Sequence, residues 1–369
     1  MTQNRRAFLQ NTLLQGTAAM AAAQAVSGVA AAQAPACPSG WKPKPFRRIT
    51  TEEAFTTPEI AAARSGASSI GGTVTPYRKL INEELLDIDA GRLKVMDQYG
   101  ISMQVLSSNG SSLQDLPADL GQKLAIQFND RMAEAIRKHP TRFAGLAGVA
   151  PQDPVAAAKE IDRALGKLKL NGAFIASNTN GEYLDDPKFS PIFEVLVQHD
   201  APLYLHPREM HPGVPAVMKV PGFTVGWGYA TEASIHVIRL MAGGVFDRFP
   251  KLRMVIGHMG EALPFWIDRL DNRYLWEFNS SGKAKPMKRL PSEYLRDHFH
   301  LTTSGMNYWP QLKMTIEVMG IDRVMFAVDY PQEEHQPAVD VIDKAPLSKE
   351  DREKFYYRNA ERVFGIKTT

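Results

Sequence analysis

The chain of 369 residues contains a single cysteine, Cys37. One cysteine excludes an intrachain disulfide framework and any zinc site that is built from a cluster of cysteines. If the protein binds a metal ion, its protein ligands must therefore be His, Asp and Glu side chains. The position of Cys37 near the start of the chain favours a disordered, processed or lipid-modified end over a reactive site.

An excess of charge of one sign is also lacking, because 43 basic residues stand against 40 acidic residues, for a net charge of +3. A protein that binds nucleic acid would concentrate basic residues on one face, so this balance argues against such a partner. Beyond the amino terminus, no run of about 18 apolar residues could span a bilayer. We therefore expect a small-molecule partner and no stable membrane span after processing.

The amino terminus carries the pattern of an exported bacterial protein. Arg5-Arg6 precedes an uncharged, alanine-rich stretch over residues 13–32, and Ala32-Gln33-Ala34 resembles a small-residue cleavage site. A twin arginine before such a stretch is typical of the twin-arginine export route. A disordered or amphipathic amino terminus is the alternative.

This pattern divides the chain into three parts. We expect a signal peptide over residues 1–34, an exposed lead-in over residues 35–46 and a single domain over residues 47–369. The mature protein is then expected in the periplasm. The cleavage point stays open because Pro35 fits poorly after a cut, and acylation of Cys37 is a further alternative.

Apolar residues make up 44% of the chain and recur in short runs that alternate with amphipathic segments. The runs predict strands at Arg48–Glu53, Met103–Ser108, Phe143–Ala150, Ala173–Ser177, Leu203–His206, Met254–His258, His300–Thr303 and Val324–Asp329. The segments between them predict helices at Leu85–Tyr99, Gln122–Lys138, Val155–Leu168, Ser190–Gln198, Ala233–Ala242 and Trp309–Val318.

Such alternation predicts parallel strands covered by helices. Eight units in one chain favour an α/β fold of the closed (β/α)8 TIM-barrel type. The alternative, an open doubly wound sheet, would carry a glycine-rich phosphate-binding turn after its first strand, and the sequence has none there.

Polar residues stand where the predicted strands end. These endings are Glu52-Glu53, Ser177-Asn178, His206-Pro207-Arg208, His258-Met259-Gly260-Glu261, Thr302-Thr303-Ser304 and Asp329-Tyr330. The active site of a barrel lies at the carboxyl ends of its strands, so residues that are far apart in sequence are expected to converge there.

Glu52, His206 and Asp329 are the candidate metal ligands. A carboxylate such as Asp329 is costly to bury without a cation, and two carboxylates with one imidazole leave positions open for water or substrate. The ligand set suits Mn²⁺ or Zn²⁺, and the sequence does not choose between them. Because side chains alternate along a strand, Glu52 is expected to face the barrel mouth, and a solvent-exposed position is the alternative for Glu53.

His258 and Glu261 form a second candidate pair. We expect His258 close to the metal as a proton shuttle or substrate-binding group, with Glu261 fixing the tautomer of its imidazole. The alternative is that His258 only caps a turn.

Several motifs resemble the decarboxylase branch of the amidohydrolase superfamily, which includes γ-resorcylate, 2,3-dihydroxybenzoate and 5-carboxyvanillate decarboxylases. The resemblance covers about Arg48 to Phe364. The motifs are Thr50-Thr51-Glu52-Glu53-Ala54-Phe55, Tyr204-Leu205-His206-Pro207-Arg208, Gly257-His258-Met259-Gly260-Glu261 and Phe326-Ala327-Val328-Asp329-Tyr330-Pro331.

The resemblance implies that Glu52, His206 and Asp329 bind one divalent ion and that His258 and Glu261 act as an active-site pair. It further implies that Arg269 reaches the pocket of a neighbouring subunit, which predicts a homodimer or homotetramer. Arg78 aligns with a carboxylate-binding arginine, and Tyr330 is expected to line the ring of the substrate. Two positions depart from the pattern. Ala54 stands where many members carry a histidine, although the 5-carboxyvanillate enzyme resembles this chain in having alanine, and Gln332 stands where that enzyme has a tyrosine.

The leading hypothesis is the metal-dependent, non-oxidative decarboxylation of an ortho-hydroxy aromatic acid, with Asp329 as proton donor. Arg269 and Arg78 would then contact a carboxylate. One alternative is the hydrolysis of a lactone, amide or related bond by metal-bound water. A metal-free barrel that acts as a binding or structural protein is the other.

Overall fold

The computed structural model describes residues 40–64, 75–215 and 218–367. The predicted signal peptide, Cys37 and the start of the lead-in lie outside the described residues. The strands are β1 (Ile49–Phe55), β2 (Met103–Ser108), β3 (Phe143–Gly145), β4 (Ala147–Gly148), β5 (Ala173–Ala176), β6 (Leu203–His206), β7 (Met254–Ile256), β8 (Phe299–Thr302) and β9 (Val324–Met325).

Helices connect and cover these strands. They are α2 (Pro58–Ala63), α3 (Pro76–Leu86), α4 (Ala90–Tyr99), α5 (Ala118–Lys138), α6 (Pro154–Gly166), α7 (Ser190–Gln198), α8 (Tyr229–Ala242), α9 (Val245–Arg248), α10 (His258–Glu261), α11 (Leu263–Ser281), α12 (Pro291–His298), α13 (Trp309–Met319), α14 (His335–Lys344), α15 (Lys349–Glu353) and α16 (Asn359–Phe364). Short turns of 3₁₀ or π type are η1 (Pro187–Phe189), η3 (Thr224–Gly228), η4 (Ile321–Arg323) and η5 (Lys354–Arg358).

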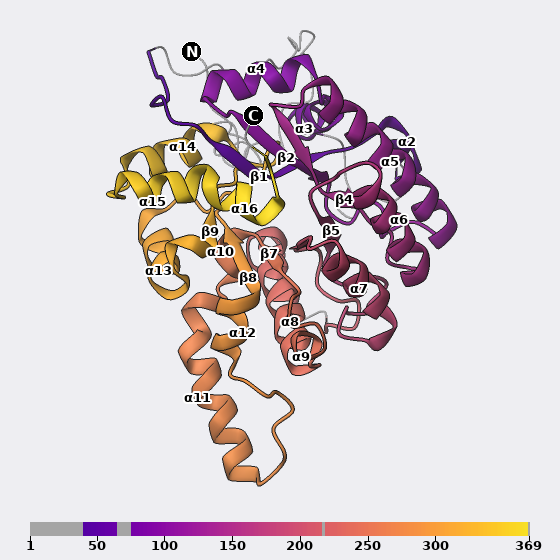
Figure 1. The fold of residues 1–369 in the computed structure, drawn as a ribbon, viewed down its shortest axis with the longest axis vertical. Helices are drawn as coiled ribbons and strands as arrows, with labels where there is room; N and C mark the ends of the chain where they lie inside the picture. The colour runs from indigo at the N-terminus through magenta and orange to yellow at the C-terminus, as the bar shows by residue number, and fades with distance from the viewer. Residues whose placement is uncertain (1–39, 65–74, 216–217, 368–369) are drawn as a thin grey trace, which may run out of the picture.

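The strands form a closed ring of parallel neighbours (Figure 1). They run in the order β1–β2–β3 and then β4 to β9, and only Leu146 separates β3 from β4. The ring closes where Glu53 bridges to Tyr330, and the N–H of Ala54 donates to the carbonyl of Tyr330 at 2.8 Å. Counting β3 and β4 as one strand, this arrangement confirms the predicted (β/α)8 barrel.

Apolar side chains fill the barrel and seal one end of it. The interior group comprises Ile49, Met103, Val105, Ala144, Leu146, Phe174, Tyr204, Val255 and Met325, joined by Ala360, Val363 and Phe364 of α16. These residues come from the first half of most strands, so α16 covers the amino-terminal end of the barrel. A larger apolar cluster packs the helices onto the outside of the ring. The carboxyl ends of the strands are thereby left for polar side chains.

Three predicted elements illustrate how the predicted bounds differ from those in the structure. The helix predicted over Leu85–Tyr99 is wrong as one element, because the carboxylate of Asp87 accepts the N–H of Asp89 and separates α3 from α4. The strand predicted over Phe143–Ala150 is interrupted at Leu146. The last strand, predicted over Val324–Asp329, pairs only at Val324–Met325, because side chains bind the backbone beyond that point.

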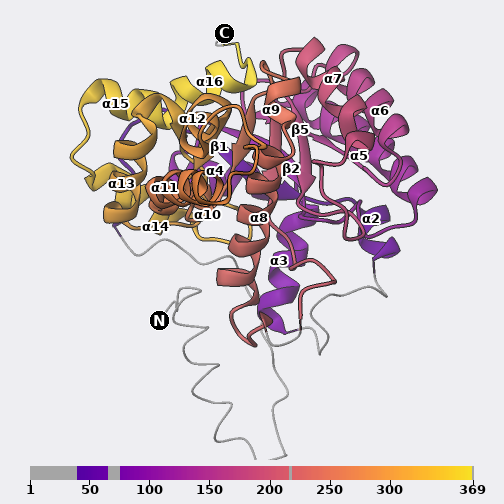
Figure 2. The ribbon, with the colours of Figure 1, turned by 90° about the horizontal axis from the view of Figure 1, so that it is seen from below.

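Two parts of the molecule reach away from the barrel. Helix α11 and the chain that leads to α12 extend outward at the lower end of Figure 1. Turned by 90°, the molecule presents α3 and the start of α8 on one side, where they follow the carboxyl ends of β1 and β6 (Figure 2). Within the described ranges, no helix is both long and apolar enough to cross a membrane.

Candidate active site

Glu52, His206 and Asp329 converge at the carboxyl ends of their strands. Each offers one ligand atom, and these atoms lie within 4.8 Å of one another. Glu52 lies in β1, His206 ends β6, and Asp329 follows β9 on the segment that closes the ring. The structure thus gathers the three residues from chain positions that are far apart, as expected for the mouth of a barrel.

Two hydrogen-bond acceptors face each other at this point. Nδ1 of His206 lies 2.5 Å from the carbonyl oxygen of Pro207, so it carries the proton and leaves Nε2 with a lone pair. That Nε2 lies 3.2 Å from Oε1 of Glu52, a buried oxygen with no hydrogen-bond donor among the described residues. A cation between the two atoms resolves this arrangement, so the residues fit a divalent metal ion.

The second carboxylate oxygen of Glu52 is held by hydroxyl groups. Tyr204 and Ser304 both donate to Oε2, and Thr302 donates to the same oxygen at 3.4 Å. These roles were not predicted from the sequence, although Tyr204 stands two residues before His206 and strand alternation places both inside the barrel. Gly257 is required nearby, because a Cβ there would lie 2.7 Å from Oε2 of Glu52.

His258 and Glu261 lie on a left-handed turn beside the metal ligands. Nδ1 of His258 is 2.7 Å from Oε1 of Glu261, and Nε2 is 3.8 Å from Oδ2 of Asp329. The predicted strand Met254–His258 ends at Ile256, and every residue from His258 to Ala262 has a positive φ. Each non-glycine residue in this conformation costs about 1–3 kcal/mol, and such residues concentrate at functional sites.

Burial and charge shift the pKa values of the site in opposite directions. Burial raises the pKa of Asp329 to about 7, and the charge of Glu52 adds to this effect while His258 opposes it. For Glu52, burial alone would raise the pKa, but His258 and His206 bring it below its ordinary value. Burial lowers the pKa of His206, which keeps that imidazole neutral. The site therefore combines a neutral imidazole with a carboxyl group able to hold a proton near neutral pH.

The pKa of His258 is raised well above its ordinary value, although burial alone would lower it, because the carboxylates of Glu261 and Glu52 stabilise the cation. His258 is therefore a cationic hydrogen-bond donor next to Asp329. This placement goes beyond the capping of a turn.

Glu53 is fully buried, so the solvent-exposed alternative for it is wrong. Its carboxylate accepts the backbone N–H groups of Val328 and Tyr330 at 3.0 and 3.2 Å. Burial raises the pKa of Glu53 to about 8, and the N–H of Val328 and the charge of Arg92 oppose that rise. Both glutamates of the pair are therefore internal, one towards the metal ligands and the other towards the backbone around Asp329.

The predicted substrate-binding residues occupy different places. Arg78 is exposed on α3, and Arg269 is exposed on α11, outside its own barrel. Tyr330 is 4% exposed, and its ring lies 4.9 Å from the ring of His335 and 4.9 Å from the guanidinium carbon of Arg92.

The two positions that depart from the family pattern, Ala54 and Gln332, both lie close to α3. Ala54 packs against Ile81, and the backbone carbonyl of Gln332 accepts a hydrogen bond from the hydroxyl of Tyr77.

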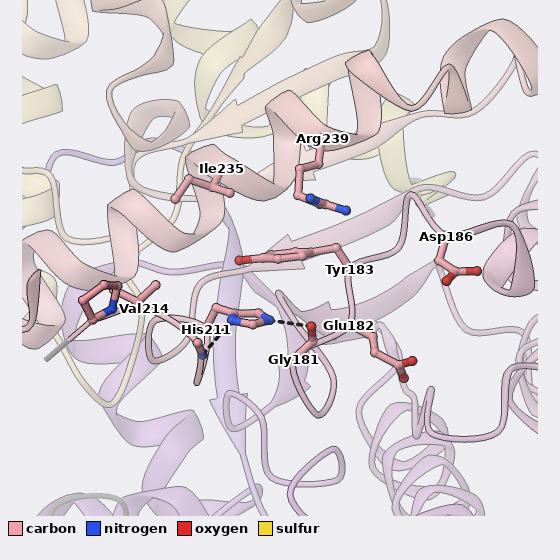
Figure 3. A pocket seen from close by; sticks show the side chains of 10 residues that line it. Gly181, Glu182, Tyr183, Asp186, His211, Val214, Ile235 and Arg239 are labelled. Atoms are coloured by element: carbon pink, nitrogen blue, oxygen red, sulfur yellow. Dashed lines mark hydrogen bonds between the residues drawn. The ribbon is translucent and has the colours of Figure 1, made fainter.

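A pocket of about 560 Å³ opens between α8 and the loops that follow β5 and β6 (Figure 3). In Figure 3 the ring of Tyr183 lies between His211 and Arg239, with its centroid 5.5 Å from that of His211 and 4.8 Å from the guanidinium carbon. Both ring nitrogens of His211 are within hydrogen-bond distance of backbone groups, at Gly181 and Gly213. The predicted metal ligands do not line this pocket, so we place the chemistry at the strand ends.

Comparison with known proteins identifies the relatives of this architecture. Residues 77–366 match the sequence model of the amidohydrolase family. The chain is 34% identical over 328 residues to γ-resorcylate decarboxylase of Rhizobium sp. strain MTP-10005, an alignment that covers 86% of this chain and 98% of the relative.

Two solved decarboxylase structures also superpose on this chain. The 5-carboxyvanillate decarboxylase of Sphingomonas paucimobilis superposes with a TM-score of 0.82 and 39% identity, over 87% of this chain and 99% of that one. The 5-carboxyvanillate decarboxylase of Novosphingobium aromaticivorans, complexed with manganese and 4-hydroxy-3-methoxy-5-nitrobenzoic acid, superposes with a TM-score of 0.79 and 36% identity, over 87% and 96%.

Proposed function

The chain belongs to the amidohydrolase family, and from this membership we propose that it is a metal-dependent, non-oxidative decarboxylase. Its substrate is an aromatic carboxylic acid with a hydroxyl group ortho to the carboxylate. The molecule bound to the Novosphingobium enzyme supports this substrate class, because its nitro group stands next to a ring hydroxyl, where it can imitate a carboxylate.

One divalent ion serves this reaction, and Mn²⁺ is favoured over Zn²⁺ because a solved relative holds manganese. Glu52, His206 and Asp329 would bind it through the atoms that lie within 4.8 Å of one another. When bound, the ion supplies Lewis-acid stabilisation of negative charge on the phenolic and carboxylate oxygens of the substrate.

The residues around the ion manage one proton. Asp329 lies beside the ion, where its carboxyl group can pass a proton to the ring carbon that bears the carboxylate. The electron pair of the bond to the carboxylate then returns to the ring, CO₂ leaves, and Asp329 takes up a proton again from water. His258, held by Glu261 at 2.7 Å, points Nε2 towards Asp329 and can donate a hydrogen bond to a phenolic oxygen.

The observation that carries this proposal is the convergence of Glu52, His206 and Asp329 beside His258, in a chain that spans nearly the whole length of the decarboxylases. The test supplies Mn²⁺-loaded protein with ortho- and para-hydroxybenzoic acids, carboxyvanillate and aryl lactones. Release of CO₂ and release of acid are followed separately. We expect CO₂ from at least one ortho-hydroxy acid and none from the para isomers, whereas turnover of a lactone alone would favour hydrolysis.

We further propose that the enzyme works as a homodimer or homotetramer in which Arg269 serves a neighbouring subunit. Helix α11 extends away from its own barrel and exposes Phe265, Trp266 and Trp276 at 70%, 47% and 60%. Exposed aromatic side chains on a projecting element favour a protein interface. Arg78, exposed on α3, is proposed to contact the substrate carboxylate from within the same subunit, and Tyr330 to border the ring.

Mixing inactive variants tests this arrangement. Arg269→Ala and Asp329→Asn each abolish most activity alone, because each removes a different part of the same site. In a hybrid assembly, a site with an intact Asp329 from one subunit receives an intact Arg269 from the other. Recovery of activity on mixing supports the shared site, and no recovery between subunits that exchange freely contradicts it.

Export to the periplasm by the twin-arginine route is also proposed, supported by Arg5-Arg6 and the alanine-rich stretch that follows. Cell fractionation of the full chain tests it. The Arg5→Lys, Arg6→Lys double variant is expected to stay in the cytoplasm, and equal periplasmic yield from both chains would contradict this route.

A further inference from the structure

Asp329 has a backbone conformation that its own strand does not explain. Its φ is 71°, in the left-handed region, and ladder pairing in β9 ends at Met325, four residues before it. A non-glycine residue keeps such a conformation only where the surrounding structure fixes it. The direction of the Asp329 carboxylate therefore depends on contacts that side chains make with this segment.

One side chain binds the backbone N–H groups of both residues that flank Asp329. Oε1 of Glu53 accepts the N–H of Val328 at 3.0 Å, and Oε2 accepts the N–H of Tyr330 at 3.2 Å. Glu53 is fully buried, where a hydrogen bond to a carboxylate is strong and a missing partner is costly. Two buried bonds to one rigid group fix the turn on both sides of Asp329.

The surrounding contacts keep Glu53 itself in place. The amide of Gln104 lies 3.5 Å from Oε2, and Arg92 donates to Gln104 at 3.2 Å. On the opposite side of the segment, the hydroxyl of Thr303 donates to the carbonyl of Ala327 and accepts its N–H, at 2.8 and 3.0 Å. These side-chain bonds thus add to the backbone bond between Ala54 and Tyr330, and the two bonds of Glu53 lie on either side of Asp329.

We propose that Glu53 is a positioning residue, which directs the carboxylate of Asp329 towards Glu52 and His206. This inference rests on the proposed function, since it assigns Asp329 to the metal and to the substrate proton. A carboxylate suits the task because it has two equivalent acceptors for the two N–H groups. Glutamine would offer one acceptor and turn its own N–H groups towards the other peptide.

Glu53→Gln is the variant that tests the proposal, and Thr51→Val is the matched control. Thr51 lies in the same strand and donates to the carbonyl of Phe326 at 3.0 Å, so its loss also removes a side-chain bond to this segment, away from Asp329. Calorimetry measures the affinity for Mn²⁺, and electron paramagnetic resonance reports the environment of the bound ion. The rate of CO₂ release at saturating Mn²⁺ gives kcat and KM.

For Glu53→Gln we expect Mn²⁺ affinity or kcat to fall by roughly 10- to 100-fold, as when a group that orients a metal ligand is removed. The resonance spectrum should change as well, while Thr51→Val keeps wild-type values in each measurement. Glu53→Asp, which keeps the charge but is too short to reach both amides, should change in the same direction. It serves as the second variant where glutamine impairs folding.

Wild-type Mn²⁺ affinity and kcat in Glu53→Gln would overturn the proposal, and so would equal losses in Thr51→Val. Failure of both Glu53 variants to fold, with Thr51→Val folded, would also overturn it, because the carboxylate would then serve the barrel as a whole. A wild-type protein that binds no Mn²⁺ and releases no CO₂ would instead contradict the proposed function.

Discussion

At the scale of single residues, Asp329 combines two tasks in one carboxyl group. It lies within ligand distance of Glu52 and His206, and burial raises its pKa to about 7. A group of this kind can bind a cation as a carboxylate and hold a proton when the cation is weakly bound. The charges of neighbouring groups set the balance between the protonated and the ionised form, and the cationic His258 stabilises the ionised carboxylate.

Asp329→Asn is expected to lower decarboxylation by at least about 100-fold, because it removes a proton donor whose contribution is of the order of 10²–10⁴. The rate is measured as CO₂ release at saturating Mn²⁺, with bound metal quantified in the same samples. Glu134→Gln, which removes an exposed carboxylate on α5, is the control and should keep wild-type activity. Near-full activity of Asp329→Asn would contradict the assigned role.

The same pKa predicts how Mn²⁺ affinity depends on pH. Below about pH 7, Asp329 carries a proton in the metal-free protein and must lose it to bind the ion. The association constant should therefore rise about tenfold per pH unit up to this point and then level off. Titration calorimetry across this range measures the slope. In Asp329→Asn, Mn²⁺ binding should release one proton fewer, so the association constant should depend less steeply on pH. An unchanged pH dependence would show that a group other than Asp329 releases the proton.

Residue roles could be predicted from sequence only where a strand end marked them. His206 and Asp329 each end an apolar run, and Glu52 follows the β-branched run Ile49-Thr50-Thr51, so their convergence could be predicted from the geometry of barrels. The role of Glu53 could not be read in this way, because alternation along a strand turns it away from the mouth, and a β-bulge breaks the register between Thr50 and Glu53. Its backbone partners lie more than 270 residues away in the chain.

At the scale of elements, the start of β1 is joined to α14 by a buried ion pair. The guanidinium of Arg48 donates to both carboxylate oxygens of Asp343, at 2.7 and 2.9 Å, and Tyr356 donates to one of them at 2.5 Å. The Arg48 side chain is fully buried. This contact lies at the amino end of the strand, away from the candidate site, so it fixes the barrel without taking part in the chemistry.

Asp343→Ala is expected to lower the free energy of unfolding by about 3–5 kcal/mol, because it leaves the buried charge of Arg48 without its partner. Lys344→Ala on the same helix is the control, since its side chain is 73% exposed and its pair with Asp340 contributes about 0–1 kcal/mol. Urea unfolding measures both. Equal small losses in the two variants would contradict the assigned importance of the Arg48–Asp343 pair.

The long helices could be predicted better than the short strands. Ser190–Gln198 is found with its predicted bounds because an apolar face repeats along the whole segment. The last strand was too long in the prediction, since an apolar run such as Val324–Val328 does not reveal that side chains bind its backbone. Helix α11 was not predicted. Its buried stripe is short, since Leu263 and Ile267 are buried and Leu270 and Tyr274 are partly buried, while Phe265, Trp266 and Trp276 are exposed between them.

At the scale of the whole molecule, the fold separates stability from chemistry. Apolar layers fill the barrel and α16 covers its amino-terminal end, while the carboxyl ends of the strands carry charged and strained residues. Removing the metal should therefore abolish activity and leave the barrel folded. Treatment with a chelator, followed by circular dichroism and CO₂ assays, checks this, and return of activity on adding Mn²⁺ completes the test. Unfolding on chelation would contradict it.

In the proposed reaction, Asp329 places a proton on the ring carbon that loses CO₂, and product analysis in D₂O tests this role. Mn²⁺-loaded protein is mixed with the ortho-hydroxy aromatic acid that it turns over best, and nuclear magnetic resonance follows the product. We expect one deuterium at the carbon that carried the carboxylate and one CO₂ for each molecule consumed, both lost in Asp329→Asn. A product that keeps its carboxylate, with a hydrolysed bond elsewhere, would contradict it.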